Sequence, residues 1–215
     1  MPIEMPSFAG FDLITQRFDP IVTKGVSYME GRRSEAMVSM TPYWVASYST
    51  PTPHLAHLGE ADAFMMDIEA GETFRAFDTT RPRPLEYLKG PLAGTRAGGG
   101  AFDGTATITA RTFNSVTVSG LPANFQFRVS DYVEVRKSDT LVSLHRVRAD
   151  VQASAGGVVT LPIRMNLDAG VFTLPLTANF EKPAFLAQID GGSWSANRQK
   201  TARGIGFSAT EVFFS

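Results

Sequence analysis

Apolar residues at every second position mark residues 115–163 as a run of short strands. Turn-forming residues interrupt the run at 120–122, 138–139 and 156–157. Side chains two positions apart lie on the same face of a strand, so the pattern predicts half-buried antiparallel strands closed into a compact β-module. The alternating apolar positions are Val116, Val118, Phe125, Phe127, Val129, Val133, Val135, Val159, Leu161 and Ile163.

The first 50 residues carry shorter apolar and aromatic patches, at 11–18, 26–29 and 37–40, separated by proline and glycine. Short apolar patches separated by proline and glycine are typical of strands joined by turns. The best strand candidate is 42–48, which contains Trp44 and Tyr48. We interpret its aromatic rings as core or subunit packing, with ligand contact as the alternative.

One segment, at about 52–71, shows helical spacing. Thr52 is a suitable N-cap, proline follows it in the first turn, and Gly71 ends the pattern. One face is apolar and the other acidic, which predicts a helix packed on a sheet. The apolar positions are Leu55, Leu58, Ala61, Met65 and Ile68, and the acidic positions are Glu60, Asp62, Asp67 and Glu69.

The second half of the chain returns to strand patterns. Alternation is evident at 105–111, and a last strand is expected at 207–214. Between helix and strands, residues 88–104 are rich in glycine, which predicts a flexible linker and a domain junction near 85–100.

Composition narrows the class without naming a function. The 215 residues are 43% hydrophobic and 19% charged, so we expect a globular chain. The formal net charge is −1, so the protein as a whole has no positive electrostatic field that would attract nucleic acid. Cysteine is absent, which excludes disulfides and thiolate metal sites. The start lacks a signal-peptide pattern and no apolar run approaches about 20 residues, so we expect neither secretion by a signal peptide nor membrane insertion.

Candidate catalytic and metal sites are weak. His54 and His57 are three positions apart, but no motif supplies the third ligand that zinc needs. Two acidic pairs have residue types used by glycosidases, which leaves a hydrolase of cell-wall sugars as a third hypothesis. We predict no enzyme, no cofactor and no metal. The acidic pairs are Glu60 with Asp67 and Asp131 with Glu134.

A basic loop near the C-terminus is the best candidate contact site. Three cations and one indole could bind single-stranded nucleic acid, although a solvated face or a protein contact is the commoner role of such a loop. The candidate contact residues are Trp194, Arg198, Lys200 and Arg203.

Two parts of the sequence resemble the distal tail proteins of long-tailed bacteriophages. The first comprises 42–48, the helix through 60–64, and 74–83. The second comprises four short segments with strand patterns, at 116–122, 129–135, 143–147 and 158–163.

The resemblance implies a mainly β protein with two domains. A β-sandwich ring domain with one packed helix would form from 1–87 and 165–215, and 88–164 would be an inserted, peripheral OB-like or small β-barrel domain. The outer module has no recognisable sugar-binding signature, which argues against direct receptor binding.

The resemblance also implies a structural role in the virion. The protein, made in the host cytoplasm, would form a homo-oligomeric ring, expected to be a hexamer, that joins the tail-tube protein to the baseplate hub protein. DNA would pass through the lumen, and the basic loop would face the lumen or a partner. The alternative is a carbohydrate-binding module of a tail fibre or cell-surface protein, based on Trp44, Tyr48 and Trp194.

Overall fold

The structure is a computed structural model that describes residues 1–6, 15–22, 24–29, 33–38, 42–50, 58–198 and 203–213. Strands make up 47% and helices 8%, so the predicted mainly β class with one packed helix is confirmed. None of the described helices is long and apolar enough to cross a membrane.

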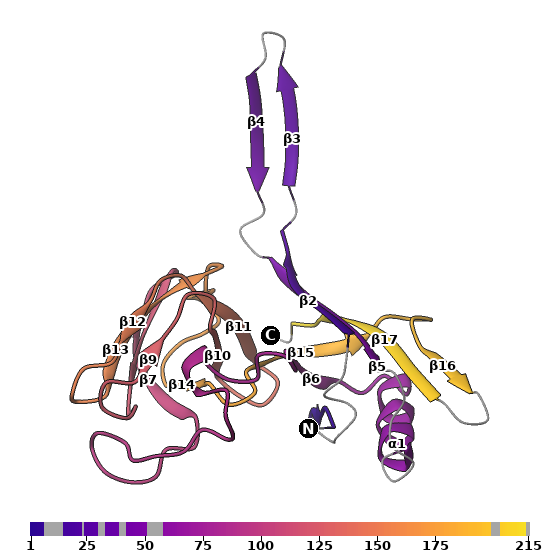
Figure 1. The fold of residues 1–215 in the computed structure, drawn as a ribbon. Coiled ribbons are helices and arrows are strands. Elements are labelled where there is room, and N and C mark those ends of the chain that lie inside the picture. The colour runs from indigo at the N-terminus through magenta and orange to yellow at the C-terminus, as the bar shows by residue number, and fades with distance from the viewer. Residues whose placement is uncertain are drawn as a thin grey trace.

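A seven-stranded sheet brings the described parts of both chain ends together (Figure 1). β1 pairs in parallel with β6, and the other neighbours are antiparallel. The strand order is β1 (Ile3–Glu4), β6 (Phe74–Phe77), β15 (Ala184–Ile189), β17 (Arg203–Glu211), β5 (Tyr43–Thr50) and β2 (Thr15–Ile21), with β16 (Ser195–Arg198) beside β17.

One helix, α1 (Leu58–Glu69), packs on this sheet. Its apolar stripe, Ala61, Phe64, Met65 and Ile68, is buried, and the Phe64 ring meets the Phe74 ring edge-on at 5.4 Å. The predicted helix began at Thr52, but residues 51–57 lie outside the described part of the chain. The predicted packing face is therefore confirmed from residue 61 onward.

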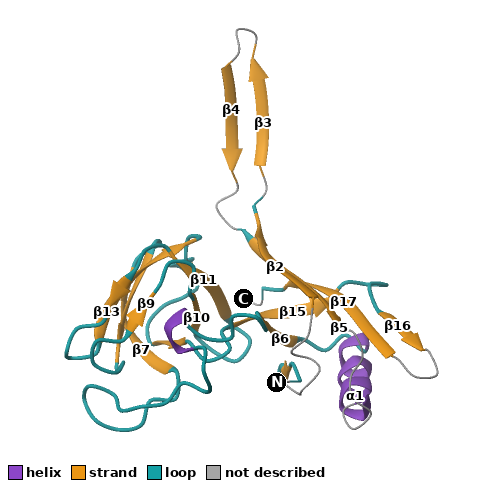
Figure 2. Ribbon diagram, in the orientation of Figure 1, coloured by secondary structure: helices purple, strands orange, loops and turns teal. Residues whose placement is uncertain are grey.

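The second lobe is a closed barrel, shown beside the sheet in Figure 2. A short sheet of β9 (Gln126–Phe127) and β12 (Val151–Gln152) and a 3-10 turn, η2 (Leu85–Tyr87), lie against it. The barrel order is β10 (Tyr132–Arg136), β11 (Val142–Val147), β13 (Val158–Arg164), β8 (Ser115–Ser119), β7 (Thr105–Arg111) and β14 (Leu176–Asn179).

The barrel extends beyond the end predicted at residue 164. β14 closes it by pairing with β7 and β10, and Leu167, Phe172 and Phe180 lie in its core. Without β14, the strands β7 and β10 would each present an unpaired edge, which a closed barrel removes. Residues 165–180 thus belong to the barrel rather than to the sheet.

The glycine-rich segment 88–104 is not a free linker. Leu92 and Phe102 are buried in the barrel core. Arg96 fixes the loop by donating hydrogen bonds to the carbonyl oxygens of Ala101, Thr105 and Gly120. The glycines instead allow tight turns with positive φ, so the prediction of a flexible connection was wrong.

Candidate functional site

A long hairpin stands away from the body of the protein (Figure 1). It consists of β3 (Lys24–Met29) and β4 (Arg33–Val38), which pair only with each other among the described residues. The register places Val26 opposite Ala36 and Tyr28 opposite Ser34. Tyr28 is 83% exposed and Val26 47% exposed, so this face presents apolar groups to solvent.

The opposite face of the hairpin is exposed as well. There Ser27 pairs with Glu35 and Gly25 pairs with Met37, and the Met37 side chain is 79% exposed. Two-stranded hairpins are at best marginally stable in water. Among the described residues, no other strand pairs with either edge of this hairpin.

A buried carboxylate joins the sheet to the barrel. Glu134 of β10 is fully buried, and its Oε1 accepts hydrogen bonds from Arg75 of β6 and from Arg136 Nε at 2.9 Å. Its Oε2 accepts from Asn179 Nδ2 and from the backbone N–H of Ala184, both at 3.0 Å. Donors from β6, β14 and β15 thus converge on one side chain.

A second polar contact crosses the same junction. The Tyr132 hydroxyl of β10 donates to Asp78 Oδ2 at 2.9 Å, and Arg146 donates to the Tyr132 hydroxyl and to the carbonyl oxygen of Phe18, both at 3.0 Å. The Arg146 guanidinium also lies 5.2 Å from the centre of the Trp44 ring. Burial, followed by the charge of Asp78, raises the pKa of Tyr132, so this hydroxyl stays protonated.

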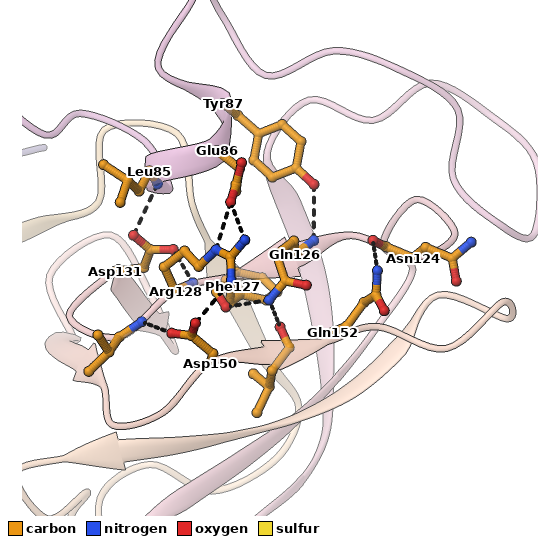
Figure 3. A network of polar contacts seen from close by, with 12 residues as sticks. Leu85, Glu86, Tyr87, Asn124, Gln126, Phe127, Arg128, Asp131, Asp150 and Gln152 are labelled. Carbon is orange, nitrogen blue, oxygen red and sulfur yellow. Dashed lines mark hydrogen bonds and ion pairs between the residues drawn. The ribbon is translucent and has the colours of Figure 1, made fainter.

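The turn η2 is anchored to the barrel by a third network (Figure 3). Asp131 Oδ1 accepts the backbone N–H of Leu85 at 3.0 Å, and Oδ2 accepts that of Arg128 at 2.7 Å. The Arg128 side chain bridges Glu86 and Asp150 at 2.6 and 3.0 Å. Burial raises the pKa of Asp131, and both of its carboxylate oxygens accept hydrogen bonds from backbone N–H groups.

The predicted acidic pairs therefore do not form a glycosidase site. Asp131 anchors η2 to the barrel and Glu134 belongs to the junction of sheet and barrel, whereas Glu60 and Asp67 lie exposed on α1. The described residues contain no group of three His, Asp or Glu side chains that could hold a metal ion. His54 and His57 lie outside the described residues.

The predicted contact loop is only partly described. Arg198 of β16 is paired with Arg203 of β17, so the two backbones lie side by side at the edge of the sheet. Lys200 lies outside the described residues. Trp194 is half-buried and packs against the sheet core.

The other aromatic residues of the carbohydrate-binding hypothesis are in the core. Trp44 and Tyr48 of β5 are each 1% exposed. Trp44 Nε1 donates to the carbonyl oxygen of Leu144 at 2.8 Å, and the Tyr48 hydroxyl donates to that of Phe77 at 2.8 Å. These two rings are packed into the protein and present no stacking surface for a sugar.

A cavity of about 630 Å³ lies at the junction of sheet and barrel. Its walls come from the start of β5, the end of β17, β11 and the segment after β13, and they include Trp44, His145, Asp168 and Glu211. Burial lowers the pKa of His145 to about 4, so its ring is neutral at pH 7.

Sequence patterns did not indicate this cavity or the exposure of the hairpin. The apolar patches at 26–29 and 37–40 were evident, but their pairing away from the body was not. The one available signal for the cavity is Glu211, an isolated acid in an apolar terminal strand.

Comparisons with known proteins supply no family. No protein-family model matches the chain, and no curated protein gives a significant match. The function is therefore proposed from the sequence resemblance together with the geometry of the described residues.

Proposed function

We propose that the protein is a structural subunit of a bacteriophage tail tip. Copies of it form a ring, expected to be a hexamer, that joins the tail-tube protein to the baseplate hub protein and leaves a lumen for DNA. It acts as a mechanical connector in the virion and catalyses no reaction.

The observation that carries this proposal is the exposed hairpin β3–β4. Val26 and Tyr28 on one face and Met37 on the other all present apolar surface to water. Burial of such surface is worth about 25 cal/mol per Å², and free strand edges add backbone hydrogen bonds when a neighbouring chain pairs with them. Identical subunits in a closed ring offer each hairpin the same neighbour on both sides.

The junction between sheet and barrel supports a mechanical role. Glu134 and Tyr132 tie the barrel to β6, β15 and the segment after β6. Tyr132 and Leu144 of the barrel also belong to the apolar core of the sheet. A peripheral domain fixed in this way keeps one orientation in every subunit, as a repeating ring requires.

Charging both faces of the hairpin should abolish assembly. We expect Tyr28→Asp combined with Met37→Asp to convert the ring into monomers, because each carboxylate would have to be desolvated at the subunit contact. The melting temperature should stay within a few degrees of the wild type, since both side chains are exposed in the monomer. Native mass spectrometry and negative-stain images, with the cognate tail-tube protein present, measure the assembly.

The matched control is Met66→Asp, which places the same charge on a 72% exposed methionine of α1. This variant should assemble like the wild type. A wild-type protein that remains monomeric with the tail-tube protein, or a double variant that still forms rings, would contradict the proposal.

A further inference from the structure

The cavity at the sheet–barrel junction has the size and composition of a binding site. Its volume of about 630 Å³ lies within the range of roughly 300–1,000 Å³ that is usual for ligand sites, which occur preferentially where domains meet. Trp44, Leu144, Met165 and Phe172 supply apolar walls.

Among the described residues that line the cavity, the charged side chains are all acidic. Glu211 projects from β17 and Asp168 from the segment after β13, whereas the described lining residues include no lysine or arginine. The remaining titratable groups are Tyr43 of β5 and His145 of β11, and the His145 ring is neutral because burial lowers its pKa to about 4. A positively charged occupant would complement these walls.

Glu211 is the acid best placed to receive a cation. Its side chain is 7% exposed, and among the described residues its carboxyl group accepts one hydrogen bond, from the backbone N–H of Trp44 to Oε2 at 2.8 Å. Burial raises its pKa to about 8, so the group is mostly protonated at pH 7 when the cavity is empty. An entering ammonium or guanidinium group would displace this proton and form a charge-assisted hydrogen bond.

We propose that this cavity binds a basic side chain of a partner protein, with its charge on Glu211 and its apolar flanking residues on the rim. The exposed apolar residues on the rim favour a protein segment as the occupant, because its flanking residues can cover them. Phe213 is 63% exposed and Val171 is 39% exposed, and a free amine inside the cavity would leave both uncovered. This docking site is independent of ring formation through the hairpin.

The charge requirement is tested with hexylammonium chloride against hexanol, which has the same chain without charge. Trp44 fluorescence in the Trp194→Phe background reports binding, because the chain has two tryptophans. We expect hexylammonium to bind about tenfold more tightly than hexanol, as one charge-assisted hydrogen bond requires. Glu211→Gln should remove this preference, while Glu69→Gln on the exposed face of α1 should keep it.

The wild-type pH profile gives a second measurement that needs no variant of the site. Hexylammonium affinity should rise about 25-fold between pH 6.5 and 8.5 as the Glu211 carboxyl group ionises. Hexanol affinity should stay constant. Equal binding of the two probes, a flat profile, or no binding of either would overturn the proposal.

The peptide Ac-Leu-Lys-Leu-NH2 and its Gln counterpart test whether the cavity binds a basic side chain as part of a protein segment. The lysine peptide should bind more tightly than hexylammonium, and Phe213→Ser should weaken the peptide about tenfold while changing hexylammonium binding less than twofold. A peptide that binds no better than hexylammonium would identify a small-amine site and contradict docking of a protein segment. Tail-tip assembly, measured separately, does not depend on either outcome.

Discussion

Glu134→Ala should lower the free energy of unfolding by about 3–5 kcal/mol, the usual cost of removing one partner of a buried ion pair. The variant leaves the Arg75 guanidinium, with a side chain 7% exposed, next to an empty space where its carboxylate was. It also leaves the backbone N–H of Ala184 without its acceptor and removes one of the two acceptors of the Asn179 amide. Urea unfolding at pH 7, followed by circular dichroism, measures the loss.

Glu4→Gln is the matched control, because Glu4 pairs with the same arginine at 3.3 Å from a side chain that is 76% exposed. Exposed ion pairs contribute about 0–1 kcal/mol, so this variant should stay close to the wild type. Similar losses for the two variants would show that burial of the carboxylate is not what stabilises the junction. A small loss for Glu134→Ala alone would show that the barrel and sheet do not depend on this contact.

The strands and the helix face could be predicted because each has a local period. The alternation at 105–111 coincides with β7, and the aromatic run 42–48 overlaps β5 (Tyr43–Thr50). Spacing of three and four placed Ala61, Met65 and Ile68 on the buried side of α1. In each case the side chains that share a face are neighbours in the sequence, so no distant partner is needed to recognise them.

Closure of the barrel could not be predicted in the same way. β14 has four residues, too few for an alternating pattern to stand out, and its place is fixed by β7 and β10 about 40–70 positions earlier. The same holds for the buried acids. Glu134 is an ordinary acid in the sequence, and its burial depends on partners from other elements, such as Arg75, 59 positions away, and the backbone N–H of Ala184.

The segment 88–104 shows a different limit. Glycine has two uses, freedom in a linker and access to positive φ in a fixed turn, and composition alone does not separate them. Here Gly104 has φ of 90° and a Cβ built on it would lie 2.7 Å from Glu181 Cβ. The glycine is required by close packing of the loop against the barrel.

The hairpin β3–β4 and the cavity beside Glu211 share one property that a sequence pattern does not reveal. On the hairpin, apolar side chains face solvent, and in the cavity the described lining residues include acids among apolar side chains but no lysine or arginine. Apolar patches were evident at 26–29 and 37–40, but alternation of apolar residues does not indicate whether the rest of the protein covers them. Their exposure follows from the tertiary arrangement alone.

The free energy of unfolding of the wild type should fall relative to that of Glu211→Gln as the pH rises from 5 to 9. The pKa of its carboxyl group is raised by burial from 4.5 to about 8, so between these values the folded protein holds a proton that the unfolded chain releases. Its stabilising contribution is complete below pH 4.5 and is lost progressively up to about pH 8. The full change is on the order of 5 kcal/mol, since each pH unit between 4.5 and about 8 is worth about 1.4 kcal/mol.

Urea unfolding of both proteins at pH 5, 7 and 9 measures this effect as a difference, in which the titration of all other groups cancels. The amide of the Glu211→Gln variant can still accept the hydrogen bond from Trp44, so the comparison isolates ionisation of the carboxyl group. Glu69→Gln, on the exposed side of α1, should follow the wild type at every pH. A constant difference between the wild type and Glu211→Gln from pH 5 to 9 would show that Glu211 ionises freely, and the cavity would then hold a carboxylate even when empty.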